Sequence, residues 1–234
     1  MQVVNRNTPL VRRGCPWDDD AAGRAIHGVR RRGAPDERTH HPPSARRAQP
    51  RPGPARLAEA TLIVIDAQAE YAAGGGLPFA GIDAALARLA DLLARARAAG
   101  APVVHVVHRG RPGGLFDGEG AAILPEAAPL PGEAVVAKTL PNAFTGTDLA
   151  ARLTGLGRRD LVLAGFMTHN CVSATARAAL DLGYRVTVAA DATATRDLPD
   201  PLGGPPLGAE AIQRAELAAL ADRTAHVAAV AAIA

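Results

Sequence analysis

The stretch that decides the fold runs from Leu161 to Leu180 and reads LVLAGFMTHNCVSATARAAL. Its first residues are continuously apolar, as in a strand buried on both faces, and its last residues are mostly small helix formers. The stretch therefore predicts a strand, a tight turn and a helix whose first turn holds Cys171. Unpaired backbone N–H groups and the helix dipole gather there, and they are expected to lower the pKa of the thiol and make it a nucleophile at neutral pH. The alternative is a small apolar residue packed between helix and sheet, which is the usual place of a free cysteine.

Length and composition bound the class of protein. The 234 residues are enough for one sizeable core. The two cysteines, Cys15 and Cys171, do not make a disulfide framework, which fits a reducing compartment. Neither a signal-peptide pattern nor an uncharged apolar run of about 20 residues is present, so we expect a soluble, cytoplasmic protein without membrane partners.

The N-terminal residues 1–56 differ from the rest of the chain. They contain 12 arginines, five acidic residues and eight of the 19 prolines, and no helical or strand period persists. This composition predicts a disordered tail, followed by one domain over residues 57–234. One alternative is a tail that binds polyanions. Another is that translation begins near residue 57, so that the given start is over-extended. Because residues 57–234 have a small excess of acidic residues, we expect no nucleic-acid partner.

Short apolar runs alternate with helical patterns after residue 57. The expected strands are residues 61–66, 102–107, 133–138, 160–164, 184–190 and 225–230, and the expected helices are 82–98, 147–153 and 209–220, besides the helix that holds the cysteine. This alternation predicts an α/β fold in which a parallel sheet is covered on both faces. Residues 109–131 are rich in Gly and Pro and form a long loop, of the kind that shapes or covers a site.

Three polar residues lie where buried strands end. Asp66 ends the first strand, Lys138 ends the third, and Cys171 follows the fourth. The carboxyl ends of parallel strands meet at one edge of a sheet, where functional groups gather. Lys138 is the only lysine, although the chain uses arginine at every other basic position. This bias favours a buried site that needs a compact ammonium over a chance surface lysine. An acid, an ammonium and a thiol would form a nucleophilic centre.

Several motifs resemble the isochorismatase-like superfamily of cysteine hydrolases, which includes nicotinamidases, ureidoacrylate amidohydrolases and streptothricin-hydrolase-like enzymes. They are IDAQ at 65–68, Lys138 followed by NAFTGTDL at 142–149, GFMTHNCV at 165–172, DLGYRVTV at 181–188 and DATATRDL at 191–198. The resemblance covers residues 57–234. It implies a three-layer fold with a six-stranded parallel sheet in the order 3-2-1-4-5-6, and a homo-oligomer.

The resemblance also implies a mechanism. Asp66, Lys138 and Cys171 would form a catalytic triad that cleaves a small amide through a thioester at the cysteine. A cis peptide bond would join Phe166 to Met167, and the N–H groups of Met167 and Cys171 would form an oxyanion hole. The expected class is a hydrolase that acts on non-peptide C–N bonds of a small-molecule substrate.

The region after the second strand departs from the nicotinamidases, which carry an Asp-x-His motif and a further histidine as a metal site. It reads HVVHRGRPGGLFD at 105–117 and lacks that motif. His105 and His108 are three residues apart and would point to opposite faces of a strand. We therefore expect no metal and no other cofactor, with His105 in the core and His108 able to reach the edge of the site. The thiol favours amide chemistry over the vinyl-ether cleavage of isochorismate hydrolases.

Further residues are candidates for the substrate pocket: Tyr71, Phe116, Asn142 and His169, with Phe79 and Phe144 as residues that fit the core better. His169 is the best contact candidate because it lies two residues before Cys171, although a packing or capping role is equally open.

The main alternative function is a non-catalytic binding or scaffold protein on the same fold. The presence of Asp66, Lys138 and Cys171 favours the enzyme. A dinucleotide-binding domain is set aside, because the glycine fingerprint is absent after the first strand.

Overall fold

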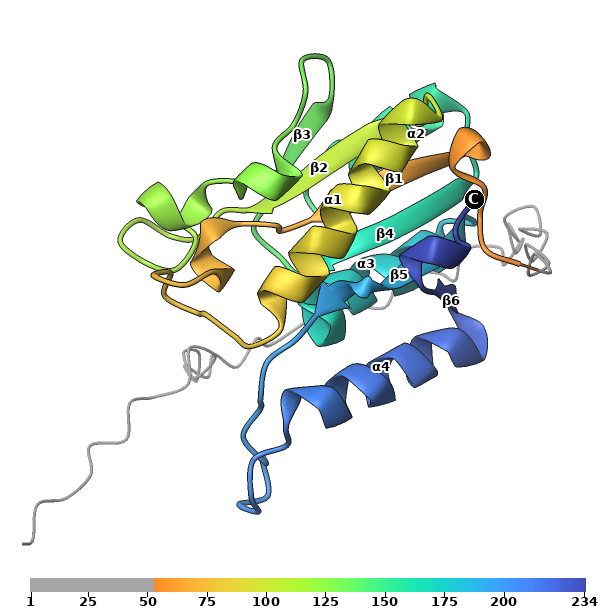
Figure 1. The fold of residues 1–234 in the computed structure, drawn as a ribbon. Helices are drawn as coiled ribbons and strands as arrows, with labels where there is room; N and C mark the ends of the chain where they lie inside the picture. Colours follow the sequence, from red (N-terminus) through yellow and green to blue (C-terminus); the bar gives the residue numbers. More distant parts are fainter. Residues whose placement is uncertain (1–52) are drawn as a thin grey trace, which may run out of the picture. The chain divides into compact units, whose positions relative to one another are not determined.

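A single parallel sheet forms the centre of the fold in the computed structural model, which describes residues 53–234. Its strands are β1 (Ala60–Ile65), β2 (Val103–His108), β3 (Ala134–Lys138), β4 (Asp160–Phe166), β5 (Arg185–Ala194) and β6 (His226–Ala228). The strand order is β3-β2-β1-β4-β5-β6, and every neighbouring pair is parallel. The predicted fold class and strand order are confirmed (Figure 1).

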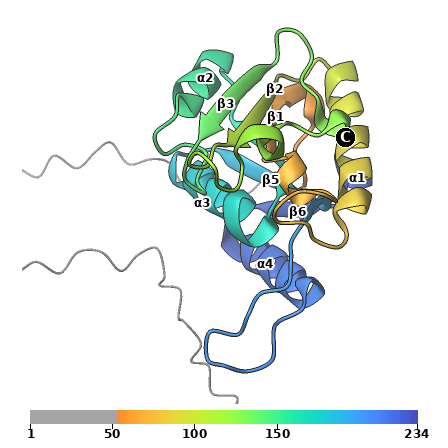
Figure 2. The ribbon, with the colours of Figure 1, turned by 90° about the vertical axis from the view of Figure 1, so that its left-hand side faces the viewer.

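Helices cover both faces of the sheet, as Figure 2 shows from the side. They are α1 (Ile82–Ala98), α2 (Leu149–Leu156), α3 (Ser173–Asp181) and α4 (Ala209–Arg223). Leu89 and Leu93 of α1 pack with Leu62 and Val64 of β1 in one apolar core. The opposite face of β1 contributes Ile63 and Ile65 to a second core with α2, α3 and α4.

The two central strands are apolar because both of their faces are covered. Every residue of β1 and β4 is buried. Successive side chains of a strand point to opposite faces, so a strand between two helical layers needs apolar residues at nearly every position. This requirement explains why the continuous apolar runs could be read from the sequence as central parallel strands.

A packed residue lies shortly before the predicted boundary at residue 57. Most of the predicted tail, residues 1–52, lies outside the described residues. Ala55, however, is buried, and its backbone N–H donates a hydrogen bond of 2.9 Å to Thr187 Oγ1. This burial and this bond tie Ala55 to β5, so the packing of the domain extends at least to Ala55, and the boundary at residue 57 stays a prediction.

The turn that holds Cys171 differs from the predicted helix start. Thr168–Val172 form a π-helical turn, and α3 begins only at Ser173. A π-turn is wider than an α-turn, and single turns of this kind occur frequently at functional sites. Cys171 therefore lies in the π-turn, between the end of β4 and the start of α3.

The predicted loop 109–131 is partly ordered into 3-10 turns, Gly118–Ala121 and Pro125–Ala127. An isolated β-bridge pairs Ile123 with Gln68, so the loop is attached to the segment that follows β1.

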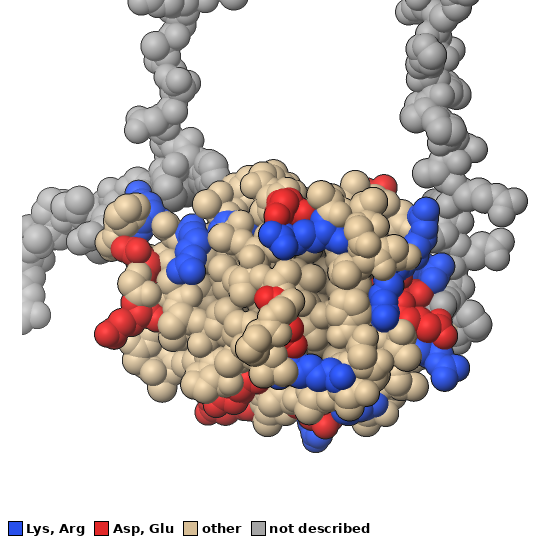
Figure 3. All heavy atoms as spheres, turned by 90° about the horizontal axis from the view of Figure 1, so that it is seen from above, with Lys and Arg blue, Asp and Glu red and all other residues tan. Residues whose placement is uncertain are grey.

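Two surface properties bear on the expected partners. Figure 3 shows basic and acidic side chains interspersed on one face of the molecule. Within residues 53–234, no helix combines the length and the apolar character needed to span a bilayer.

Candidate active site

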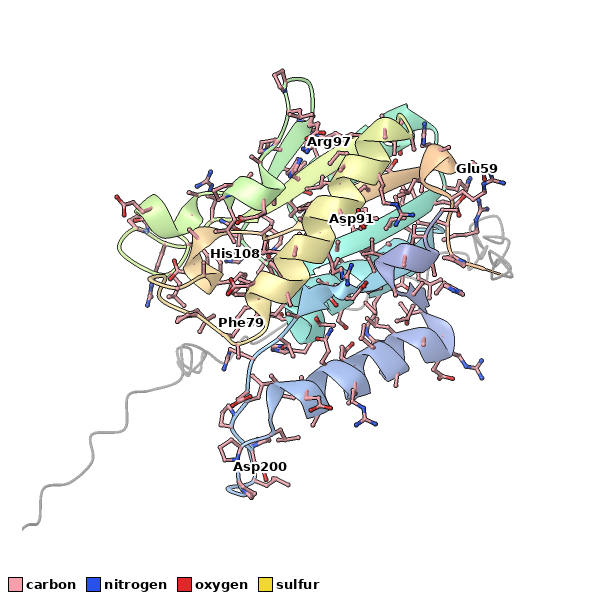
Figure 4. All side chains as sticks on the ribbon, viewed as in Figure 1. Glu59, Phe79, Asp91, Arg97, His108 and Asp200 are labelled. Carbon is pink, nitrogen blue, oxygen red and sulfur yellow. The ribbon has the colours of Figure 1, made fainter. Side chains whose placement is uncertain are left out.

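Three side chains from separate strands meet at the carboxyl edge of the sheet. Asp66 follows β1, Lys138 is the last residue of β3, and Cys171 lies in the turn after β4; all three are buried. Lys138 Nζ lies 2.7 Å from Asp66 Oδ2 and 3.4 Å from Cys171 Sγ. In Figure 4 the labelled residues His108 and Phe79 lie near this edge, and Glu59 lies at the opposite end of the sheet. The structure thus brings the three predicted residues together.

The backbone at Asp66 turns sharply. Its φ of 48° lies in the left-handed region, which few residues other than glycine adopt. Two backbone hydrogen bonds hold this conformation, since Asp66 N–H donates to Val106 O and Gln68 N–H donates to Asp66 O, both at 2.8 Å. Such conformations persist only where the surroundings enforce them, and they cluster at functional sites.

Burial sets the electrostatics of the thiol. Desolvation and then the neighbouring Asp66 raise the pKa of Cys171 to about 12, and Lys138 acts in the opposite direction. The expected lowering of this pKa is therefore wrong for the resting site, because burial and the adjacent carboxylate outweigh the ammonium. Desolvation also raises the pKa of Asp66, while Lys138 lowers it. The resting centre holds a neutral thiol beside a buried carboxylate–ammonium pair.

His108 adds a fourth group to this cluster. It is paired with Lys138 in the register of β2 and β3, and its Nδ1 lies 3.2 Å from Lys138 Nζ. Burial, followed by the charge of Lys138, lowers the pKa of His108 to about 4. The imidazole is therefore neutral at pH 7, and its Nδ1 is the acceptor for the ammonium. The expectation that His108 reaches the edge of the site is confirmed.

His105 lies in the core, as predicted. It is 1% exposed, and its Nε2 lies 2.8 Å from Glu133 Oε2. Glu133 also accepts hydrogen bonds from Arg97, with a distance of 2.8 Å between Arg97 Nε and Glu133 Oε1. His105 is thus part of a structural polar cluster. Among the described residues, no group of three or more His, Cys, Asp or Glu side chains is arranged to hold a metal ion.

Aromatic rings line the cluster on one side. Tyr71 packs against Phe79, Phe116 and Phe166, with ring centroids 5.4, 5.1 and 6.1 Å away. Desolvation raises the pKa of Tyr71, and the next largest contributions come from Cys171 and Asp66. Tyr71 therefore lies within electrostatic reach of the reacting groups. Phe116 contacts both Tyr71 and the ring of His108, at 5.0 Å from the latter.

Asn142 and Phe144 serve the loop in which they lie. Asn142 Oδ1 accepts a hydrogen bond from Phe144 N–H, and its Nδ2 donates to Thr145 Oγ1, both at 2.9 Å. Phe144 stacks on Tyr184, with the ring planes 22° apart. Both ends of the Asn142 amide are thus used locally, and Phe144 is the packing residue that the sequence favoured.

His169 lies in the π-turn with Cys171. Its Nδ1 is hydrogen-bonded to the hydroxyl of Thr195, which directly follows β5. Burial, followed by the charge of Arg196, lowers the pKa of His169, so its ring is neutral at pH 7. The Nδ1 side of the half-buried ring is therefore used in a hydrogen bond within the protein.

Two polar residues were missed as functional candidates. Gln68 lies next to His108 and bonds to both of its backbone groups, at 2.7 Å from His108 N and 3.0 Å from His108 O. Glu70 is buried and accepts hydrogen bonds from the N–H groups of Gly76 and Phe116. Glutamate is rarely buried, so its type alone predicts exposure. The spacing Asp66-x-Gln68-x-Glu70, directly after a buried strand, is the sequence pattern that could have indicated these two residues as site candidates.

The backbone before the nucleophile completes the geometry. The peptide bond between Phe166 and Met167 is cis, the form that the resemblance implied. Met167 precedes the π-turn, so its backbone and that of Cys171 both lie at the N-terminal end of the helical segment that continues into α3.

Comparisons with known proteins agree with this geometry. A secreted isochorismatase effector of Verticillium dahliae is 42% identical over 151 residues, which are 63% of this chain and 79% of that protein. Streptothricin hydrolase of Streptomyces noursei is 42% identical over 141 residues, covering 59% of this chain and 55% of that protein. Ureidoacrylate amidohydrolase of Stutzerimonas stutzeri is 32% identical over 183 residues, covering 62% and 74%.

The solved structures lead to the same family. An isochorismatase from Pseudomonas putida has a TM-score of 0.74 and 46% sequence identity, covering 77% of this chain and 93% of that chain. The sequence model of the isochorismatase domain matches residues 60–232, a range that contains all six strands as well as Asp66, Lys138 and Cys171. The chain therefore belongs to the isochorismatase family.

Proposed function

We propose that this protein is a cysteine hydrolase that cleaves the C–N bond of a small amide through a thioester at Cys171. The observation that carries the proposal is the position of the Lys138 ammonium, 2.7 Å from a buried carboxylate and 3.4 Å from a buried thiol. Relatives named streptothricin hydrolase, ureidoacrylate amidohydrolase and maleamate amidohydrolase support amides as the substrate class.

Asp66 is the proposed general base. Burial raises the pKa of its carboxyl group, which makes the carboxylate a stronger base than an exposed aspartate. Its Oδ2 is engaged by Lys138, and the Cys171 thiol is among the hydrogen-bonding groups that act on the carboxylate. The carboxylate is thus placed to take the proton of Cys171. Because burial and Asp66 raise the pKa of the thiol, we infer that this transfer accompanies the attack of sulfur on the substrate.

Lys138 compensates the charge that forms on sulfur. As the proton moves to Asp66, one negative charge passes from the carboxylate to the thiolate, and both lie next to the same ammonium. The ammonium therefore stabilises the site before and after the transfer without moving. An interaction already in place costs no reorganisation during the reaction.

Transfer of the acyl group to Cys171, and then to water, uses the same three side chains. Sulfur adds to the amide carbonyl, and the N–H groups of Met167 and Cys171 bind the oxyanion at the N-terminal end of the helical segment. Asp66 returns the proton to the leaving amine, and the C–N bond breaks to leave a thioester on Cys171. Water, deprotonated by Asp66, adds to the thioester, the carboxylic acid leaves, and the proton restores the thiol.

The proposed pocket wall consists of Tyr71 and Phe116, with the neutral ring of His169 as a polar contact. Tyr71 and Phe116 are largely apolar and close to the cluster. Asn142 was also predicted to line the pocket, but its side chain is used in its own turn.

An ammonia-release screen over primary amides, ureido compounds and lactams tests the proposal. The wild-type protein is expected to turn over at least one compound, and Cys171→Ala to lose about 10³-fold or more of that activity, as loss of a nucleophile does. The matched control is Cys15→Ala, the other cysteine, which is expected to keep the wild-type rate. Turnover that survives in Cys171→Ala would refute the proposed nucleophile. If no amide class is hydrolysed, the binding or scaffold function is favoured instead.

A further inference from the structure

We propose that His108 is a positioning residue of the catalytic centre, which fixes the direction of the Lys138 ammonium by accepting its third hydrogen bond. An ammonium has three N–H groups and no acceptor. Lys138 Nζ has three neighbours that can accept: Asp66 Oδ2 at 2.7 Å, His108 Nδ1 at 3.2 Å and Cys171 Sγ at 3.4 Å. With all three bonds made, the ammonium has no freedom to turn away from the thiol.

Burial makes the third acceptor important. Lys138 is 2% exposed, so solvent cannot take the place of a missing partner. A buried charged donor without an acceptor is unfavourable, and the ammonium would then rotate or lose its proton. Either change would weaken the interaction with Cys171. His108 therefore acts on the nucleophile through Lys138.

The fold holds His108 at both its backbone and its ring. Gln68 Oε1 accepts from His108 N–H at 2.7 Å, and Gln68 Nε2 donates to His108 O at 3.0 Å. The ring meets that of Phe116 in a T-shaped arrangement, and Phe116 N–H donates to Glu70 Oε2 at 2.8 Å. Residues after β1 and in the loop after β2 thus cooperate to place one imidazole beside Lys138.

A neutral acceptor suits this position better than a charged one. The charged groups that face His108 are Lys138 from β3 and, through it, Asp66 after β1. A second carboxylate would add negative charge near a thiol whose pKa Asp66 already raises. An imidazolium would place a second cation 3.2 Å from Lys138 Nζ. Neutral imidazole with its proton on Nε2 accepts the bond without adding charge.

Two variants separate this role from other roles of the ring. Asparagine places a neutral oxygen where Nδ1 lies, whereas leucine offers no acceptor. The readout is the alkylation rate of Cys171 by iodoacetamide between pH 5 and 10, located by peptide mass spectrometry. We expect His108→Asn to stay within about threefold of wild type. We expect His108→Leu to react about tenfold more slowly at pH 7, with its pH profile displaced upward by about one pH unit.

A spectroscopic measurement reads the tautomer of His108 in the wild-type protein itself. Nitrogen chemical shifts of histidine-labelled protein, assigned by the signal lost in His108→Asn, are expected to show the neutral Nε2–H tautomer at pH 7. An imidazolium or an Nδ1–H tautomer would overturn the proposal. It would also be overturned if His108→Leu alkylated like wild type, or if His108→Asn were as slow as His108→Leu.

The role of His108 in catalysis rests on the proposed function of Cys171 as the nucleophile. The alkylation and tautomer measurements, however, need no amide substrate. Failure of the ammonia-release screen would therefore leave the alkylation and tautomer results interpretable on their own.

Discussion

At the scale of single residues, the site depends on how one ammonium is shared. Lys138 lies between Asp66 and Cys171, and its burial makes each of its hydrogen bonds matter. The positions of these three residues at strand ends could be predicted from the sequence, because parallel strands deliver their carboxyl ends to one edge. The raised pKa of Cys171 could not be predicted from the sequence, since it depends on side-chain burial and on the approach of Asp66.

Replacing Lys138 with arginine tests the need for a compact ammonium. Guanidinium is planar and larger, so it cannot direct single N–H groups toward Asp66, His108 and Cys171 from the same point. We expect Lys138→Arg to lower kcat/KM by about 10²-fold or more, measured with the best amide from the screen. The matched control is Arg214→Lys on the exposed side of α4, expected to match wild type. Near-normal activity in Lys138→Arg would contradict the assigned role.

The pH dependence of activity follows from Asp66 and His108. Burial raises the pKa of Asp66 above the ordinary aspartate value of 3.8, and the base must be ionised to act. Protonation of His108, whose pKa is about 4, would remove the third acceptor of Lys138 in the same acidic range. We therefore expect kcat/KM to fall as the pH drops, with the midpoint of the acid limb above pH 4. A profile that stays flat down to pH 4 would contradict the role of Asp66 as base.

At the scale of elements, the contact between β1 and β4 explains why one glycine was needed. Gly165 has a φ of 115°, and a Cβ atom there would lie 2.0 Å from Ile65 O. The sequence predicted β4 and the nucleophile turn, but the π-turn over Thr168–Val172 was missed. Hydrophobic periodicity cannot distinguish one wide turn from the α-helix that follows it.

Gly165→Ala is expected to destabilise the fold strongly. The added methyl group would force β4 away from the backbone of β1, and alanine is strained at positive φ. We expect a loss of about 2 kcal/mol or more in the free energy of unfolding, measured with urea. Gly155→Ala is the control, because its Cβ would meet nothing within 4 Å in α2. That control is expected to be neutral or stabilising by up to about 1 kcal/mol. Equal effects in the two variants would contradict the close approach.

At the scale of the whole molecule, the sheet and both helical layers could be predicted from the alternation of elements and the family resemblance. The N-terminal boundary at residue 57 stays a prediction, because a short alanine and proline segment has no period and tertiary contacts decide whether it packs. At the other end of the chain, Ala234 O accepts a hydrogen bond of 2.6 Å from Leu57 N–H. The homo-oligomer expected from the resemblance remains a prediction, which light scattering on the purified protein can test.

Truncation tests where the domain begins. A chain that starts at Gly53 keeps the bond from Ala55 N–H to Thr187 Oγ1, whereas a chain that starts at Leu57 loses it together with the burial of Ala55. We expect the first chain to match full-length activity within about twofold, and the second to unfold about 1 kcal/mol more easily. Thermal and urea denaturation measure the difference. Identical stability of the two chains would support the predicted boundary at residue 57.

The covalent role of Cys171 is the central claim, and mass spectrometry of the acid-quenched protein and its peptides tests it most directly. The protein is mixed with an amide that it hydrolyses, quenched with acid in the steady state, and digested to locate any adduct. The predicted result is a mass increase equal to the acyl part of the substrate, confined to the Cys171 peptide and absent in Cys171→Ala. Turnover with no adduct on the wild-type protein, or with the adduct on another residue, would contradict the thioester mechanism.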